Sequence, residues 1–445
     1  MPHGATDPGR LKIAVIGAGV SGLSAAWLLS QRHLVTVYEA QGRLGGHTNT
    51  VLAPSDAGDP VPVDTGFIVY NELNYPNLVA MFAHLGVATR ASDMSFAVSL
   101  DKGGLEYGST DLRALFAQKR NLLRPRFWSM LWDLQRFYRT APLAADEPSL
   151  TLGQYLTQHR YGAAFRNDHL LPQGSAIWSS DLGAIADYPM VSFVRFFANH
   201  GLLDLDVKAR PQWRTVVGGS RAYIAPLTAP YADRIRLNAP VRRVLRTPDG
   251  VEVTDAMGAA GRYDHVVIAA HAPEALAMLD EPTLAEQEVL GALRYRPNTA
   301  VLHSDTSLMP RRRAAWSAWN YVGASGGGGE VTYWMNRLQG LVGPRQYLVS
   351  LNPPISPKPE AVITTIAYDH PIFDHAAAAA QRRLWSLQGV RNTWFCGAYF
   401  GSGFHEDGLQ AGLAVAEALG GVRRPWTVAD ESGRIVLNPQ MAGAA

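Results

Sequence analysis

Cysteine is almost absent, because the 445-residue chain contains one, Cys396. A single cysteine excludes an intrachain disulfide and fits a reducing compartment, so we expect a cytoplasmic protein. Zinc patterns are lacking as well, since the 13 histidines include no H-E-x-x-H motif and there is no cysteine pair. The G-x-S-x-G match at residues 323–327 ("GASGG") lies in a glycine-rich turn between two predicted strands, with no helix after it, so it marks no nucleophilic serine. The sequence therefore predicts neither a metal site nor a hydrolase of that type.

A strong charge of one sign is also lacking. The net charge of +2 gives no reason to expect a nucleic-acid partner. The composition, 47% hydrophobic and 18% charged, is that of a soluble globular protein. A chain of this length is expected to form about two or three domains.

No apolar run is long enough to be a convincing membrane span. The best candidate is "IAVIGAGVSGLSAAWLL" at residues 13–29, whereas a spanning helix needs about 20 apolar residues. Its glycines have the spacing of a turn, and no small-residue cleavage site follows its apolar part. We therefore expect no inserted segment, which leaves peripheral contact with the inner face of a membrane open.

The same run contains a dinucleotide-binding motif. Residues 13–16 predict a buried strand, and the glycines that follow form G-x-G-x-x-G at the start of a predicted helix. The first glycine permits a tight turn, the second lets the backbone approach a pyrophosphate, and the third lets the helix pack on the strand. The helix N-terminus offers free N–H groups to phosphates. The residues of this motif that we expect to contact the cofactor are Gly17, Gly19, Val20, Ser21 and Gly22.

An acidic residue ends the next predicted strand. Glu39 lies 22 residues after Gly17 (39 − 17 = 22), close to the position, about 20 residues on, where an acid binds the ribose 2′-hydroxyl. An acid at this position disfavours the 2′-phosphate of NADP.

A second pair of glycines points to FAD. "AQGRLGGHTNT" follows Glu39, and a plain NAD domain has no need of glycines there. The longer FAD must run past another close stretch of backbone. "VDTGFIVY" at residues 63–70 then predicts a further strand with an acid and a glycine. The cofactor contacts expected from these segments are Ala40, Arg43, Gly45, Gly46, His47, Thr48, Thr65, Gly66 and Phe67.

Together these segments resemble the N-terminal signature of flavin-containing amine oxidases and phytoene-desaturase-like enzymes. The resemblance continues over residues 213–227, 235–270 and 392–419, so that it covers about half of the chain. It implies an FAD cofactor, with Val241 beside the adenine. In the last block a strand ends at Gly397, and the resemblance implies a helix from about Gly408 and Leu409 under the isoalloxazine ring.

The last block also contains candidates for proton handling. His405, Glu406 and Tyr399 precede the helix expected under the flavin and could take a proton from the substrate. The alternative is that they hold the loop or cap the helix. Two departures from the relatives stand out. Ala398 replaces the acid that often binds the ribityl chain, and "NTAVLHSDTSLMP" lacks the lysine that amine oxidases place beside flavin N5.

The predicted fold class is α/β with two domains. A discontinuous Rossmann-like domain would bind FAD, and a second α+β domain, with a helical part and an antiparallel sheet, would bind the substrate. The predicted segments are 10–75, 211–284 and 386–445 for the first domain, and 76–210 and 285–385 for the second.

One helix of the second domain allows two interpretations. "RPRFWSMLWDLQRFYRT" at residues 124–140 places apolar residues on one stripe, which Trp128 and Trp132 widen, and arginines on the other face. It is either a core helix of the domain or a basic amphipathic helix that touches a membrane or admits a lipid.

The chain lacks a second dinucleotide motif, so we expect the substrate itself to reduce the flavin, as in an oxidase or a desaturase.

The chain also resembles a bacterial group of predicted NAD/FAD-binding proteins. The segments that carry this resemblance are "GGHTNT", "DTGFIVYN", "AVLHSD", "SAWNY" and "GAYFGSGFHEDGLQAG". That group is similar to the N-terminal portion of plant cyclopropane-fatty-acid synthases.

This closer resemblance implies a desaturase or oxidase that acts on an unsaturated or methyl-branched fatty acyl chain of a lipid. The alternatives are an amine or other small-molecule oxidase, and a flavoprotein partner of a lipid-modifying enzyme without turnover of its own. The oligomeric state is not predicted.

Overall fold

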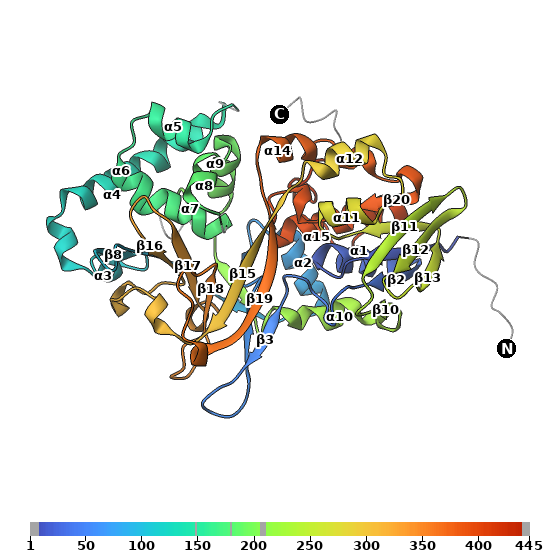
Figure 1. Ribbon diagram of the computed structural model, residues 1–445, viewed down its shortest axis with the longest axis horizontal. Coiled ribbons are helices and arrows are strands. Elements are labelled where there is room, and N and C mark those ends of the chain that lie inside the picture. The colour runs from blue at the N-terminus through green and yellow to red at the C-terminus, as the bar shows by residue number, and fades with distance from the viewer. Residues whose placement is uncertain (1–8, 147–148, 179, 205–210, 438–445) are drawn as a thin grey trace.

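Two lobes make up the protein, and long strands run between them (Figure 1). The residues that the computed structural model describes are 9–146, 149–178, 180–204 and 211–437. Residues 147–148, 179, 205–210 and 438–445 of the predicted domain segments lie outside these ranges. The mixed α/β architecture predicted from the sequence is confirmed.

Five parallel strands form the sheet that carries the nucleotide motif. In spatial order they are β10 (Ile235–Arg236), β2 (Leu34–Tyr38), β1 (Lys12–Ile16), β14 (His265–Ile268) and β20 (Thr393–Phe395). The residues of β1 from Ile13 to Ile16 are all buried, as expected for a strand that is covered on both faces. Because the strands are parallel, their carboxyl ends share one edge, and ligands of such sheets bind outside that edge.

Two helices pack closely beside this sheet. They are α1 (Val20–Ser30), which opens with the glycine motif, and α15 (His405–Gly420) from the C-terminal block. A Cβ atom at Gly412 would lie 2.2 Å from the carbonyl oxygen of Ser21, so only glycine permits this approach. Sequence reasoning started the second helix near Gly408, whereas the structure starts it three residues earlier.

The hydrophobic core around the parallel sheet reaches beyond the predicted domain segments. It includes Leu78, Met81 and Phe82 of α2 (Pro76–Leu85). It also includes Ala377 and Leu384, which lie in and after α14 (His375–Gln381). The predicted boundaries place these residues in the second domain, but their side chains are buried with the first.

Three smaller sheets and short helices complete the first lobe and its junction with the second lobe. The sheets are β11 (Val241–Thr247), β12 (Gly250–Asp255) and β13 (Ala260–Tyr263); β3 (Thr50–Ala53) and β4 (Val61–Asp64); and β5 (Tyr70–Asn71), β9 (Trp213–Val216) and β6 (Thr89–Ala91). The helices are α10 (Ile224–Thr228), α11 (Ala272–Met278) and α12 (Leu284–Gly291).

A seven-stranded sheet forms the centre of the second lobe. Its spatial order is β19 (Val362–Pro371), β15 (Tyr295–His303), β18 (Leu348–Leu351), β17 (Gly329–Trp334), β16 (Trp319–Gly323), β7 (Phe96–Leu100) and β8 (Leu105–Gly108). All neighbours are antiparallel except β16 and β7. The glycine-rich turn "GASGGGG" joins β16 to β17, whose ends pair Gly323 with Gly329.

Helices cover the other side of this lobe (Figure 1). They are α3 (Leu112–Leu115), α4 (Pro125–Thr140), α5 (Leu152–Gln158), α6 (Ala163–Phe165), α7 (Leu171–Trp178), α8 (Leu182–Ala186), α9 (Met190–Asn199) and, within the sheet layer, α13 (Met335–Leu338).

The helix α4 differs from its predicted pattern. Trp128 and Trp132 do not widen the buried stripe, because 49% and 70% of their surfaces are exposed. Asp133 instead lies on the buried side. It accepts a hydrogen bond from the amide of Gly162 at 2.8 Å and forms an ion pair with Arg136 at 2.9 Å. A buried carboxylate needs such partners, and an apolar-stripe argument does not predict it.

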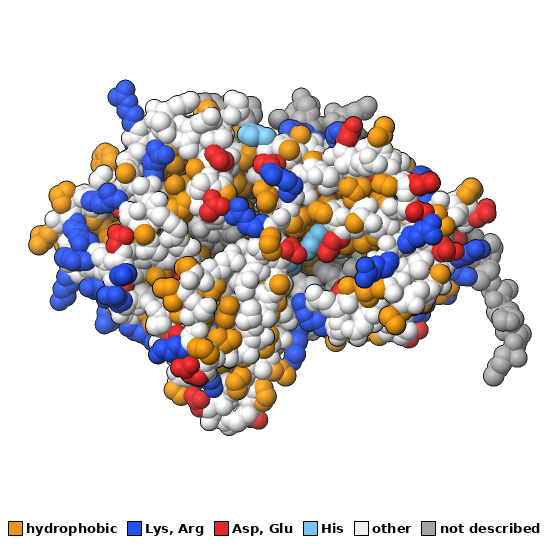
Figure 2. All heavy atoms as spheres, viewed as in Figure 1, with side chains coloured by type: hydrophobic (Ala, Val, Ile, Leu, Met, Phe, Trp, Pro, Cys, Tyr) orange, Lys and Arg blue, Asp and Glu red, His pale blue; other side chains and the backbone are white. Residues whose placement is uncertain are grey.

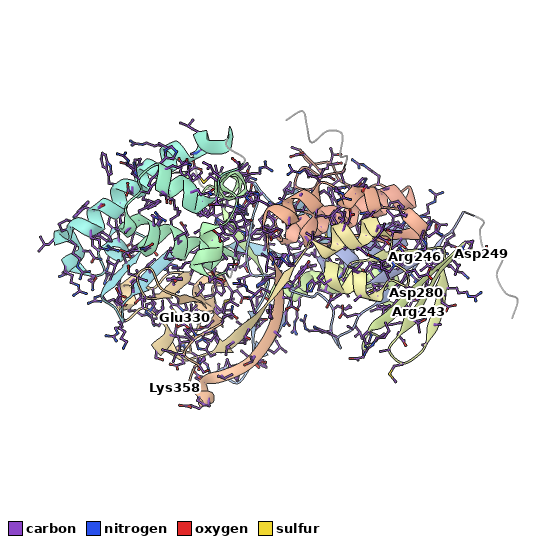
Figure 3. All side chains as sticks on the ribbon, turned by 45° about the horizontal axis from the view of Figure 1, so that its top comes forward. Arg243, Arg246, Asp249, Asp280, Glu330 and Lys358 are labelled. Atoms are coloured by element: carbon purple, nitrogen blue, oxygen red, sulfur yellow. The ribbon has the colours of Figure 1, made fainter. Side chains whose placement is uncertain are left out.

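A buried carboxyl group in β17 should make the stability depend on pH. Figure 3 labels Glu330, whose side-chain Oε2 has no hydrogen-bond partner among the described residues. Burial raises the pKa of Glu330 from 4.5 to about 7. Between about pH 4.5 and pH 7 the folded protein therefore keeps the proton on Glu330, whereas the unfolded chain releases it. The stability that this provides is complete below about pH 4.5 and is lost as the pH rises to about 7.

We expect Glu330→Gln to remove this dependence. The variant should exceed the wild type by about 2 kcal/mol of unfolding free energy at pH 8, allowing for screening by water, and should show no gain at pH 4.5. Denaturant titrations at both values measure the difference. Glu360→Gln, at an exposed position of the same lobe, is the control. Equal pH slopes for wild type and Glu330→Gln would contradict the expectation.

Candidate cofactor and substrate site

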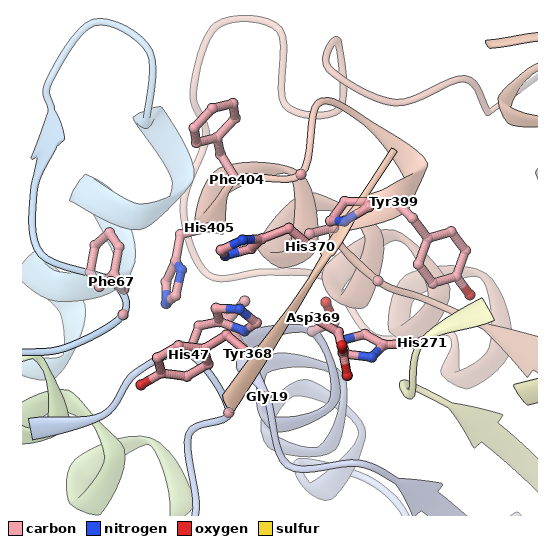
Figure 4. Close-up of a pocket in the computed structure, with 18 of the residues that line it drawn as sticks. Gly19, His47, Phe67, His271, Tyr368, Asp369, His370, Tyr399, Phe404 and His405 are labelled. Carbon is pink, nitrogen blue, oxygen red and sulfur yellow. The ribbon is translucent and has the colours of Figure 1, made fainter. Parts of the chain in front are cut away.

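A cavity of about 850 Å³ extends from the carboxyl edge of the parallel sheet to the helices of the second lobe. One end is lined by the glycine motif, and the other by aromatic side chains of α7, α9 and the seven-stranded sheet. Figure 4 shows the middle, where side chains from both lobes face one another. The volume is at the upper part of the range for small-molecule and cofactor sites.

The glycine motif forms a tight turn that opens onto the cavity. Gly17 has φ +100°, and a Cβ atom there would lie 2.7 Å from the carbonyl oxygen of Ala269. Gly19 is different, since no described atom lies within 4 Å of its would-be Cβ. Because Gly19 has no side chain, its backbone is open to the cavity. Among the described residues no side chain caps α1 at Gly19, so its first N–H groups stay available to phosphates.

The second glycine pair lies directly beside the first motif. The amide of Gly45 donates to the carbonyl of Ala18 at 2.8 Å, and a Cβ atom at Gly46 would lie 3.2 Å from Gly19 Cα. Arg43 donates to the carbonyl of Gly46 at 2.8 Å. Arg43 is not part of the cavity wall, so the structure gives it the task of holding this loop.

Glu39 is fixed at the end of β2. Its Oε2 accepts a hydrogen bond from the amide of Ala18, and its Oε1 accepts one from the amide of Gln41, both at 2.8 Å. The carboxylate thus faces the cavity with lone pairs left for a ribose hydroxyl. Ala40 and Val241 line the same end, as expected for the adenine side.

The middle of the cavity holds buried polar atoms without partners. The Nε2 atom of His47 and the hydroxyl of Tyr399 have no hydrogen-bond partner among the described residues, and both side chains line the cavity. Buried polar atoms in proteins are normally paired. The ring of His47 stacks on Tyr368 at 4.7 Å (Figure 4). These unpaired atoms, the open space beside Gly19 and the hydrogen-bonded carboxylate of Glu39 together fit an elongated polar cofactor such as FAD.

Asp369 and His271 both line this part of the cavity (Figure 4). Sequence reasoning missed both. They come from the end of β19 and the start of α11, so they meet only in the folded chain. Asp369 places a carboxylate in the cavity wall, whereas Ala398 offers none.

The three candidates for proton handling lie in different environments. His405 is the first residue of α15 and lines the cavity, with its ring stacked on Phe67 at 3.7 Å (Figure 4). Its Nε2 lies 2.8 Å from the hydroxyl oxygen of Thr48. Burial lowers the pKa of His405 to about 3. The ring is therefore neutral at physiological pH and serves as a hydrogen-bonding group.

Glu406 does not line the cavity. Its Oε1 accepts from the backbone amide of Asn77 at 3.0 Å and from the side-chain amide at 2.8 Å, and its Oε2 accepts from the amide of Leu78 at 3.0 Å. These bonds cap the N-terminus of α2. Burial raises the pKa of Glu406, and the hydrogen bonds oppose this. The geometry therefore gives Glu406 the capping role that the sequence left open, instead of proton transfer with the substrate.

Tyr399 lines the cavity. Burial raises the pKa of its hydroxyl well above the ordinary value, so it donates or accepts a hydrogen bond without ionising. Besides Arg43, four predicted cofactor residues are not in the cavity wall and support it from behind. Gly22 and Gly408 give close packing around α1, Leu409 is buried in the core, and Thr48 holds His405. The predicted contacts that do line the cavity are Gly17, Gly19, Val20, Ser21, Glu39, Ala40, Gly45, Gly46, His47, Thr65, Gly66, Phe67, Val241 and Gly397.

An aromatic chamber forms the other end of the cavity. The ring of Phe196 stacks on Phe404 at 5.0 Å and on His200 at 3.9 Å, which connects α9 to the start of α15. Trp178 of α7 packs against Phe196 at 4.8 Å. The charged side chains of the described cavity wall are Glu39, Arg242, Glu274 and Asp369. None of them comes from α7, from α9 or from the strands β7, β16 and β17, which supply Phe96, Trp319 and Tyr333, so the wall of the chamber is neutral.

Four polar atoms of the chamber have no partner within the described parts of the chain. They are the Nε1 atoms of Trp178 and Trp319, the Oε1 atom of Gln173 and the Nε2 atom of His200. The Nδ1 atom of His200 lies 2.8 Å from the carbonyl oxygen of Phe196, and a carbonyl only accepts, so Nδ1 carries the proton. Burial lowers the pKa of His200 to about 3, which leaves Nε2 as a bare acceptor.

Comparison with known families gives one match over most of the chain. The flavin containing amine oxidoreductase family matches residues 20–306. The Mycobacterium tuberculosis protein AofH, which carries the name flavin-containing monoamine oxidase, is 29% identical over 269 residues. The match covers 57% of this chain and 55% of that protein, so it spans about half the length of the curated relative.

Solved structures share the fold along nearly the whole chain. Cyclohexylamine oxidase from Brevibacterium oxydans has a TM-score of 0.64 at 19% identity, covering 92% of this chain and 99% of that one. A CLA-producing fatty acid isomerase from P. acnes has a TM-score of 0.65 at 15% identity, covering 93% and 99%. At these identities the likeness shows the fold alone.

Proposed function

We propose that this chain oxidises a fatty acyl chain of a lipid. The premise is that the chain belongs to the flavin containing amine oxidoreductase family. As a member of that family it is an FAD-dependent oxidoreductase. The reaction proposed is a desaturation or oxidation that removes a hydride from an apolar carbon. The observation that carries the proposal is the aromatic chamber without a charged side chain in its described wall.

FAD, when bound, supplies a hydride acceptor, and the protein supplies orientation, exclusion of water and proton handling. Phe196 and Phe404 form an apolar wall where the chamber meets α15. An extended hydrocarbon would lie against such rings and displace water from them. With its pKa lowered to about 3, His200 is a weak base, so its bare Nε2 serves as a hydrogen-bond acceptor in the chamber and does not take up a proton. Glu406 lies outside the chamber, so a proton released with the hydride leaves to water.

The chamber polarity also bears on where the lipid's polar part lies. A free fatty acid would carry a carboxylate, and a buried carboxylate needs a cation or several donors. Arg242, the one arginine of the described cavity wall, belongs to the adenine end. An esterified acyl chain carries no such charge. The unpaired indole N–H groups of Trp178 and Trp319 could donate to an ester or hydroxyl oxygen.

An amine oxidase is the second candidate, and it is supported by the relatives with that activity in their names. The bare Nε2 of His200 could accept from an amine N–H. Against it, no lysine lies in the described cavity wall, in agreement with the lysine-free strand noted in the sequence. The fatty acid isomerase among the fold neighbours supports the view that this fold can accept an acyl chain.

Ligand-induced stabilisation tests the proposal without turnover. Holoprotein that has been reduced with dithionite and kept anaerobic cannot oxidise the lipid, and it should gain about 3 °C or more in Tm with oleoyl lysophosphatidylcholine below its micellar concentration. Butylamine and cyclohexylamine at the same concentration should give no shift. Lysophosphatidylcholine with a two-carbon acyl chain is the control for the headgroup. A shift with the amines and none with the oleoyl lipid would favour the second candidate instead.

A further inference from the structure

Exposed apolar side chains gather at the end of the second lobe, far from the cavity wall. They lie on α3, on the turn η1 (Lys119–Leu123) and on the outer face of α4. Their exposed fractions are 74% for Leu112, 48% for Leu122, 87% for Leu123, 49% for Trp128 and 70% for Trp132. Single exposed apolar residues are common on soluble proteins, but a contiguous group marks an interaction surface.

These side chains belong to one surface. The indole N–H of Trp128 donates to the carbonyl oxygen of Leu122 at 2.9 Å, which ties the turn to the helix. Trp132 follows Trp128 by four residues, so the two rings lie on the same helix face. Arg139 continues this exposed face two turns later. We call the surface of residues 112–139 the arm surface.

The arm surface is also strongly basic. Residues 112–139 contain seven lysine and arginine residues and one aspartate, a net charge of +6 (7 − 1). The whole chain has +2 (40 − 38), so the remainder carries −4 (2 − 6). Figure 2 shows blue side chains gathered at this end of the molecule, with apolar ones among them. The small net charge of the chain thus hides a marked separation of charge.

Three of the seven cations are free to act on a partner. Arg126 pairs with Asp168, and Arg136 pairs with Asp133 and stacks on Tyr161, so these two hold the fold. Arg113, Lys119 and Arg139 are exposed, and no ion pair or hydrogen bond of their side chains occurs within the described ranges. The unpaired cations lie on the same surface as the exposed leucines and tryptophans.

We propose that the arm surface docks on a bilayer that contains anionic phospholipid. Such a bilayer satisfies both features, because its headgroups attract the cations while leucine and tryptophan side chains enter the boundary with the acyl chains. A polyanion such as nucleic acid would neutralise the cations and leave the apolar side chains in water. The contact is peripheral, since the described part of the chain contains no helix that is long and apolar enough to span a membrane. The anionic inner leaflet is the expected partner surface.

Vesicle flotation of the holoprotein tests the charge requirement. Wild type should bind phosphatidylcholine vesicles that contain phosphatidylglycerol and should not bind pure phosphatidylcholine. The triple variant Arg113→Gln, Lys119→Gln, Arg139→Gln should bind about 100-fold more weakly. The matched control is Arg32→Gln, Arg262→Gln, Arg382→Gln, which removes the same charge from exposed positions of the first lobe. The control should bind like wild type.

A second pair of variants tests the apolar requirement. Leu123→Ser with Trp132→Ser should weaken binding about 10-fold or more, because both side chains leave the bilayer boundary. Met257→Ser with Val342→Ser, at positions 85% and 91% exposed elsewhere, should have no effect. Absence of wild-type binding to the anionic vesicles, or equal losses in variants and controls, would overturn the proposal. So would tighter binding to duplex DNA than to the vesicles, unaffected by the serine variants.

Discussion

Replacing Gly19 with valine should abolish FAD binding while leaving the protein folded. No described atom lies within 4 Å of a Cβ at this position, and the backbone φ of −75° suits any residue. The added Cβ therefore meets no described atom of the protein. It enters the space where the structure leaves the backbone open to the cavity. The pyrophosphate of FAD needs that close approach, so the variant should bind FAD about 100-fold more weakly.

Absorbance near 450 nm after purification, and a titration of the apoprotein with FAD, measure this effect. Circular dichroism and the Tm of the apoprotein should match those of wild type. Gly328→Val is a matched control, because its Cβ also meets no described atom and it lies in the hairpin turn outside the cavity wall. A yellow Gly19→Val protein with wild-type affinity would place the cofactor elsewhere.

Filling the aromatic chamber should slow reduction of the flavin by lipid without loss of FAD. Ile177 lies in α7, lines the chamber and is only partly buried, so part of its side chain faces the open space. Ile177→Trp adds an indole there, which an extended acyl chain cannot share. We expect the rate of anaerobic flavin reduction by an unsaturated phospholipid to fall about 100-fold, with FAD affinity unchanged.

The matched control for this variant is Ile355→Trp. Ile355 is 73% exposed and is not part of the cavity wall, so the same substitution there should leave the rate unchanged. If Ile177→Trp reduced its flavin as fast as wild type, the aromatic chamber would not be the acyl site.

The cofactor end was predictable because its signals are local. Gly17, Gly19 and Glu39 lie within 23 residues of chain (17 to 39), and each has a spacing that the strand–turn–helix unit requires. The chamber was not predictable, because α7, α9 and β16 supply its walls from distant positions. Its one sequence signal was the aromatic-rich middle of the chain, which suits a large core equally well.

His405 and Glu406 have different surroundings because they are neighbouring residues on a helix. Sequence reasoning placed them in a loop, where both could face the flavin. The structure places them in the first turn of α15, where consecutive side chains diverge by about 100°. His405 then lines the cavity while Glu406 turns to the N-terminus of α2. The start of a helix was the information that the sequence pattern lacked.

The sequence assigned the basic face to arginines within residues 124–140, of which Arg139 is free in the structure. Arg126 and Arg136 lie on the polar face in a helical projection, but tertiary partners occupy both. The charge that remains free comes partly from Arg113 and Lys119, which precede the helix. Periodicity identifies a face of one helix, whereas a docking surface is assembled from several elements.

Anaerobic mixing of the oxidised holoprotein with candidate substrates tests the central claim most directly. An unsaturated phospholipid should bleach the flavin absorbance near 450 nm, and the recovered lipid should be lighter by two hydrogens. Primary amines at the same concentration should leave the spectrum unchanged. Bleaching by amines with no response to lipid would contradict the account and identify an amine oxidase. Bleaching by neither would contradict it as well and favour a flavoprotein without turnover of its own.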